Sequence, residues 1–134
     1  MQPDGILETV LYAEDLAAAE AFYTRHFGLQ VVRRVPGRFV FLRCGGQMLL
    51  IFDPRDSARP DPDNPIPRHG ASGPGHVCFR VADGAAVQAW RDRLAAAGVA
   101  IEHDHLWPGG ARSVYLRDPA GTSVEIGEPR MWGL

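Results

Sequence analysis

The sequence predicts an α+β fold built from two consecutive βαβββ modules that form a cupped mixed sheet. The main observation is an internal repeat, because residues 6–29 resemble residues 75–99, and Asp15, Ala21 and Arg25 fall on Asp83, Ala89 and Arg93 at a shift of 68 positions. Two further pairs of segments repeat in the same order, FVFLR with SVYLR at a shift of 74 and LIFDP with EIGEP at a shift of 75. A repeat of this kind fixes the architecture, since both copies are expected to form the same structural unit.

Caps and turns then place the elements of each module. Asp15 and Asp83 are N-cap residues before alanine-rich helical segments, and Gly28 and Gly98 end those segments. Glycine- and proline-containing turns separate the apolar segments that follow, which favours strands. The expected helices are 16–26 and 84–97, and the expected strands are 6–12, 29–35, 39–44, 47–52, 75–81, 99–103, 112–117 and 122–128.

The whole chain of 134 residues is expected to be a single domain with four parts. Module 1 spans about 5–54, module 2 spans about 75–129, and residues 55–74 connect them. The segment 53–74 contains six of the eleven prolines, so we expect a semi-rigid connector with little regular structure. A tail of residues 130–134 is expected to dock on a neighbouring surface through its methionine and tryptophan.

Composition excludes several classes of function. A net charge of −2 and a pI near 6.2 argue against nucleic-acid binding. All fourteen basic residues are arginine, which excludes a Schiff-base lysine and a P-loop. The sequence shows neither a signal-type segment nor a long apolar run, so we expect a soluble, cytoplasmic protein without membrane contact. Cys44 and Cys78 do not form a disulfide framework or a CxxC zinc site and are expected to be small buried hydrophobes.

Alternation along the strands places three possible metal ligands on one face of the sheet. Val124 and Ile126 are expected to face the helices, so Glu125 faces the opposite side. By the same alternation, His76 and Glu8 face that side from their own strands. Two carboxylates and a neutral imidazole balance the charge of a divalent ion and suit Mn²⁺, Fe²⁺, Ni²⁺, Zn²⁺ or Mg²⁺. Three protein ligands leave positions open for a substrate, as in a catalytic site.

Simpler interpretations remain open for some of these residues. Glu8 could instead pair with an arginine such as Arg112 in a metal-free pocket. His103 and His105 form an HxH pair that could bind a metal, but their position before a WPGG turn favours a solvated location at the end of a strand.

Four further residues are placed on the pocket side by strand alternation, where they would line a site for a small oxygenated ligand. These candidate substrate-binding residues are Phe39, Phe41, Ser113 and Tyr115. His69 lies in the connector, close in sequence to the second module, and could line the pocket mouth or relay a proton.

The segments LETVLYAEDLAAAEAFYTRHFGL, GPGHVCFRVAD and YLRDPAGTSVEI together resemble the vicinal-oxygen-chelate superfamily, which includes glyoxalases, bleomycin-resistance proteins and extradiol dioxygenases. The resemblance covers nearly the whole chain except the connector. It implies four metal positions, which fall on Glu8, Leu50, His76 and Glu125. Leu50 cannot bind a metal and is expected to line the substrate site instead. The resemblance also implies that Glu8 and Glu125 act as catalytic carboxylates.

The favoured function is a metal-dependent, glyoxalase-like lyase, isomerase or transferase that acts on a small oxygen-rich substrate, and we expect a homodimer. A metal-free protein that sequesters a small molecule, of the bleomycin-resistance type, is the first alternative. An extradiol dioxygenase is the second alternative, although that chemistry uses two histidines and one carboxylate.

Overall fold

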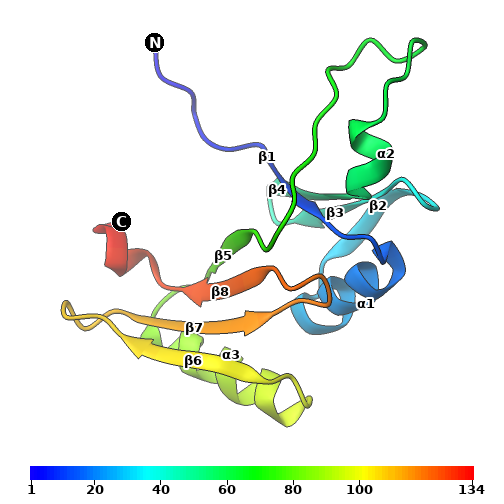
Figure 1. Ribbon diagram of the computed structural model, residues 1–134. Helices are drawn as coiled ribbons and strands as arrows, with labels where there is room; N and C mark the ends of the chain where they lie inside the picture. Colours follow the sequence, from blue (N-terminus) through cyan, green and yellow to red (C-terminus); the bar gives the residue numbers. More distant parts are fainter. The chain divides into compact units, whose positions relative to one another are not determined.

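Each half of the chain forms one four-stranded mixed sheet with a helix packed against it (Figure 1). The computed structural model describes all residues from 1 to 134. Its contacts divide the chain into unit 1, Met1–Gly73, and unit 2, Pro74–Leu134. The expected α+β fold with two βαβββ modules is confirmed.

Unit 1 has the strand order β1-β4-β3-β2, in which β1 and β4 are parallel and the other neighbours antiparallel. Its elements are β1 (Glu8–Tyr12), α1 (Leu16–Phe27), β2 (Gln30–Val35), β3 (Phe39–Cys44), β4 (Gln47–Phe52) and α2 (Pro54–Ala58). The Asp15 carboxylate accepts a hydrogen bond from the Ala18 N–H at 2.9 Å and caps α1. Gly28 ends the helix at a φ of 67°, a conformation that favours glycine. Tyr23 and Leu42 are completely buried between the helix and the sheet.

Unit 2 repeats this arrangement with the strand order β5-β8-β7-β6. Its elements are β5 (His76–Arg80), α3 (Gly84–Ala96), β6 (Ile101–Leu106), β7 (Arg112–Arg117), β8 (Ser123–Gly127) and the 3₁₀ helix η1 (Pro129–Trp132). The Asp83 carboxylate caps α3 by accepting from the Ala86 N–H at 2.8 Å. The core on the helix-covered face contains Leu94, Val124 and Ile126, all completely buried, which confirms the alternation expected for β8.

The strand register confirms the internal repeat residue by residue. In each unit the last strand lies between the first and the third. Residues at the same place in the two sheets differ in residue number by the shifts read from the sequence. Both sheets also carry an irregularity at matching positions, between β2 and β3 in unit 1 and between β6 and β7 in unit 2. The equivalent cross-strand rows are Val10–Leu50–Phe41–Arg33 in unit 1 and Cys78–Glu125–Tyr115–His103 in unit 2.

Two local expectations for secondary structure were wrong. The connector begins with α2, because the Asp53 carboxylate caps it by accepting from the N–H groups of Arg55 and Asp56. Strand β6 extends to Leu106, so His103 and His105 lie within a strand and not at its end. Pairing with β7 extends the strand, and this contact is invisible in the local sequence.

The expectations for the cysteines and the tail also needed correction. Cys44 is half-buried and Cys78 is exposed, so neither is a buried hydrophobe. In the tail, Met131 packs within unit 2, where its sulfur accepts a hydrogen bond from the Ser113 hydroxyl at 3.5 Å. Trp132, in contrast, is 75% exposed and does not dock within the chain.

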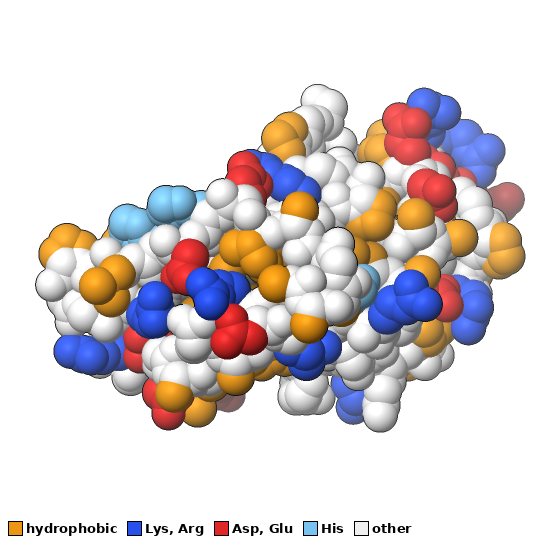
Figure 2. All heavy atoms as spheres, turned by 90° about the horizontal axis from the view of Figure 1, so that it is seen from below, with side chains coloured by type: hydrophobic (Ala, Val, Ile, Leu, Met, Phe, Trp, Pro, Cys, Tyr) orange, Lys and Arg blue, Asp and Glu red, His pale blue; other side chains and the backbone are white.

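The molecular surface carries both signs of charge. Acidic and basic side chains are interspersed over the face shown in Figure 2, as the small net charge leads one to expect. None of the helices has the length and hydrophobicity required to span a bilayer.

Candidate functional site

Glu125 lies at the centre of the helix-free face of unit 2. It occupies the middle strand β8, with Cys78 of β5 on one side and Tyr115 of β7 on the other. Glu125 is only 5% exposed, and its Oε1 is buried without a hydrogen-bond partner. A buried carboxylate oxygen of this kind is costly unless a proton or a cation compensates it.

His76 faces the same carboxylate from the start of β5. Its Nδ1 lies 3.1 Å from the Ser123 carbonyl oxygen, which can only accept, so Nδ1 carries the proton and donates. The Nε2 atom lies 3.3 Å from Oε2 of Glu125. In the neutral ring Nε2 presents a lone pair, so two acceptors face each other across this distance. A proton or a metal ion between them removes the repulsion.

This pair fits a divalent metal ion. Histidines that bind metals usually donate their other ring N–H to a backbone carbonyl or a carboxylate, as His76 does to Ser123. The unpartnered oxygen of Glu125 supplies further ligand capacity. No group of three or more His, Cys, Asp or Glu side chains lies close enough together to hold a metal ion. The structure therefore brings together His76 and Glu125, while the expected third ligand, Glu8, is an exposed residue at the start of β1 in unit 1.

Two neighbours of Glu125 remain protonated at neutral pH. Burial, reinforced by the Glu125 carboxylate, raises the pKa of the Cys78 thiol to about 12. Burial and the same carboxylate also raise the pKa of the Tyr115 phenol. Both groups are therefore neutral beside the carboxylate, and the phenol of Tyr115 can serve as a hydrogen-bond donor.

His103 and His105 share this face of the sheet, which sequence reasoning missed because it ended the strand too early. Their ring nitrogens lie 3.3 Å apart, and His103 pairs across the strands with Tyr115. Figure 2 shows histidine side chains grouped at the surface. Arg112, considered above as a partner for Glu8, instead lies 3.5 Å from Asp104 in an ion pair.

Ser113 is completely buried and already engaged. Its hydroxyl accepts a hydrogen bond from the Trp107 indole N–H at 3.0 Å and donates to the sulfur of Met131. A ligand can reach this hydroxyl only if Trp107 or Met131 moves aside.

The equivalent face of unit 1 is mostly apolar. Leu50 stands where unit 2 has Glu125 and is 8% exposed, and Phe41 stands where unit 2 has Tyr115. Phe39 and Phe41 stack with ring centroids 4.3 Å apart. Together with Phe52, they line a pocket of about 450 Å³ that also includes His69 of the connector.

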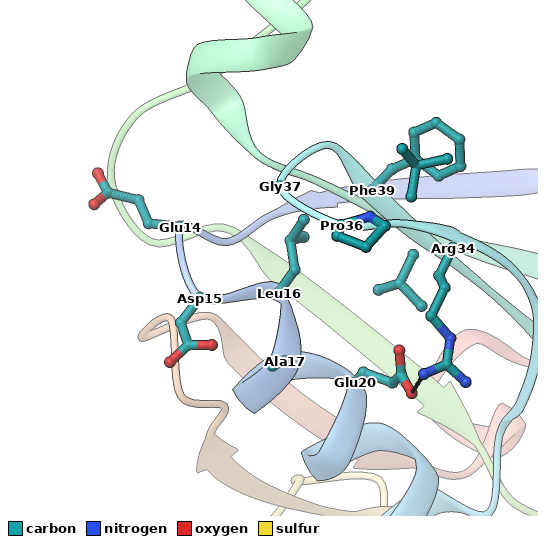
Figure 3. Close-up of a pocket in the computed structure, with 11 residues that line it drawn as sticks. Glu14, Asp15, Leu16, Ala17, Glu20, Arg34, Pro36, Gly37 and Phe39 are labelled. Carbon is teal, nitrogen blue, oxygen red and sulfur yellow. Dashed lines mark ion pairs between the residues drawn. The ribbon is translucent and has the colours of Figure 1, made fainter.

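A second pocket of unit 1, of about 570 Å³, lies beside the start of α1 (Figure 3). Its charged groups already have structural partners. Glu20 pairs with Arg34 at 3.2 Å, Glu14 pairs with Arg55 at 2.9 Å, and Asp15 caps the helix. Glu14 and Asp15 point away from the Arg34–Glu20 pair in Figure 3, so this hollow presents no convergent set of ligands.

The fold agrees with the comparisons with known proteins. Residues 5–126 match the model of the Glyoxalase/Bleomycin resistance protein/Dioxygenase superfamily, and the chain belongs to this family. A lactoylglutathione lyase from Agrobacterium tumefaciens has 56% identity, a TM-score of 0.98 and full coverage of both chains.

More distant solved structures share the fold. A glyoxalase/bleomycin resistance protein/dioxygenase from Nocardioides is 25% identical with a TM-score of 0.74, covering 96% of this chain and 85% of its own. A virulence protein from Salmonella typhimurium, at 23% identity and a TM-score of 0.70, covers 96% of this chain and 98% of its own. The comparison with curated proteins gives no significant match.

Proposed function

We propose that the chain is a metal-dependent enzyme of this family, a glyoxalase-like lyase, isomerase or transferase that acts on a small oxygen-rich substrate. The observation that supports this proposal most directly is the 3.3 Å approach of the His76 Nε2 lone pair to the buried Glu125 carboxylate. The name of the 56% identical relative makes lactoylglutathione the first compound to assay. The expected homodimer and cytoplasmic location remain parts of the proposal.

In this proposal His76, Glu125 and Glu8 hold a divalent ion, with Glu8 included on the basis of the repeat register. The ion would act as a Lewis acid on substrate oxygens. The chain itself orients the metal-binding side chains. The Ser123 carbonyl fixes the tautomer of His76, and burial restricts the movement of the Glu125 side chain. Glu8 and Glu125 are the proposed proton carriers, and the neutral phenol of Tyr115 lies beside the Glu125 carboxylate.

Metal analysis of purified variants tests this assignment. We expect about one divalent ion per chain in the wild type, loss of the ion in His76→Ala and Glu125→Gln, and weaker binding in Glu8→Gln. The variants His103→Ala and His105→Ala serve as matched controls on the same sheet and should retain the ion. If the ion is lost in His103→Ala or His105→Ala, or is retained in His76→Ala, the proposed ligand set is wrong.

A metal-free sequestering protein is the second candidate. Leu50 at the fourth ligand position and the aromatic lining of the unit 1 pocket favour it. Such a protein would bind its ligand with the same affinity in the presence and absence of a chelator, whereas the proposed enzyme loses activity when the metal is removed.

A further inference from the structure

The pocket of unit 1 that is lined by Phe39, Phe41 and Phe52 combines an aromatic wall with an excess of hydrogen-bond donors. The rings of Phe39 and Phe41 are nearly parallel, with an interplanar angle of 15°. Phe52 meets Phe41 edge-on at 5.4 Å between centroids. All three rings are only half-buried, so part of their aromatic surface is accessible to a ligand from the pocket.

Positive charge surrounds this wall. The guanidinium of Arg33 lies 5.6 Å from the centroid of Phe39, and Arg38 and Arg68 also line the pocket. Asp56 is the only carboxylate among the lining residues, and it already binds Arg38 at 3.0 Å and Arg59 at 2.9 Å. The pocket therefore carries more positive than negative charge.

One arginine donor has no partner. Arg68 donates from Nη2 to the Asp56 carbonyl at 2.8 Å, which anchors its side chain, but its Nε is buried without a hydrogen bond. A buried N–H group of this kind costs free energy until an acceptor reaches it. The ligand that completes the pocket should therefore bring an acceptor, preferably a charged one.

His69 adds a further donor. Its Nδ1 lies 2.8 Å from the Tyr12 hydroxyl, and its ring meets Phe52 edge-on at 4.7 Å. When Tyr12 donates to Nδ1, the proton of the neutral ring resides on Nε2. In that tautomer the ring that lines the pocket carries an N–H group that can donate to a ligand.

We propose that this pocket binds a planar organic anion, a conjugated ring that carries a carboxylate. The ring packs against the accessible surface of Phe39, Phe41 and Phe52, and the carboxylate accepts hydrogen bonds from the arginine and histidine donors. This inference rests on the proposed function only in treating the anion as part of the substrate. The binding itself requires no metal.

Calorimetric titration of the full-length, chelator-treated protein with 2-naphthoate tests the inference. We expect saturable binding, at least about tenfold weaker binding of the neutral 2-naphthamide, and similar weakening for the saturated, non-planar decahydro-2-naphthoate. Equal affinity for the three compounds, or no binding of 2-naphthoate, would overturn the proposal.

Variants locate the binding site. Phe41→Leu should weaken 2-naphthoate binding about tenfold. Arg68→Lys should weaken it by a similar factor, because the lysine can still donate to the Asp56 carbonyl but lacks the Nε donor. Phe22→Leu, in the aromatic cluster of α1 outside this pocket, is the matched control and should bind normally. His76→Ala should also bind 2-naphthoate normally, so failure of the metal assignment and failure of this inference give different results. Binding that survives Phe41→Leu and Arg68→Lys would contradict the proposed site.

Discussion

At the scale of single residues, Gly127 controls the space beside the Glu125 carboxylate. A β-carbon at this position would lie 3.0 Å from Cε of Met131, 3.1 Å from Sγ of Cys78 and 3.3 Å from Oε1 of Glu125. A side chain at Gly127 would therefore crowd Met131 and Cys78 and press on Oε1 of Glu125.

Gly127→Ala should weaken metal binding about tenfold while the protein stays folded, because the new methyl group displaces Oε1 of Glu125. Metal titration together with circular dichroism measures both effects. Gly75→Ala is the control, since a β-carbon beside His76 at that position meets no atom within 4 Å. Equal affinities in the two variants would show that the position of Oε1 is not critical.

Cys78 is exposed as a residue, but its thiol is partly desolvated and lies beside Glu125, so it should react slowly. With a pKa of about 12, its thiolate fraction at pH 8 is roughly a thousandth of that of an ordinary cysteine. In a Cys44→Ser background, mass spectrometry should detect alkylation by iodoacetamide far more slowly than for free glutathione. Glu125→Gln should accelerate the reaction, because removal of the carboxylate charge lowers the pKa of the thiol. Alkylation of Cys78 in the Cys44→Ser protein at the rate of free glutathione would show that burial and Glu125 do not protect its thiol.

At the scale of elements, β4 and β8 are equivalent strands with different chemistry. Leu50 and Glu125 occupy the same position in the two sheets, between the first and third strands. The apolar row of unit 1 therefore offers an empty ligand position that a single substitution can fill.

Leu50→Glu should tighten metal binding, because a fourth ligand joins the set implied by the repeat. Titration of the variant with Mn²⁺ and Zn²⁺ measures the gain, and Leu50→Gln controls for polarity without charge. Unchanged or weaker affinity in a folded Leu50→Glu protein would show that Leu50 does not face the metal.

At the scale of the whole molecule, metal binding should couple to stability and to pH. Metal that binds only the folded state raises the melting temperature, and its ligands must be deprotonated. The increase in melting temperature produced by a saturating divalent ion should therefore be large at pH 7.5 and mostly lost at pH 5, as protons compete for the ligands. Thermal denaturation with and without chelator measures this difference. An increase that does not depend on pH would argue against histidine and carboxylate ligands.

The sequence was sufficient to predict the two modules, because the repeat, the caps at Asp15 and Asp83 and the strand alternation are all local signals. It placed His76 and Glu125 on one face for the same reason. It could not show that the Ser123 carbonyl fixes the His76 tautomer, nor that β6 continues through His103 and His105. Those features depend on contacts between strands distant in sequence, which local patterns do not encode.

The shared register of the two sheets has a consequence for the history of the chain. Constant offsets along every strand are what duplication and fusion of one ancestral gene produce, and matching irregularities between β2 and β3 and between β6 and β7 fit that origin. After such an event each copy can lose what the other retains. Unit 2 carries an ionisable row around Glu125, whereas unit 1 carries a mostly apolar one around Leu50. Divergence between the copies thus separates the residues suited to chemistry from those suited to recognition, so selection can change one set without altering the other.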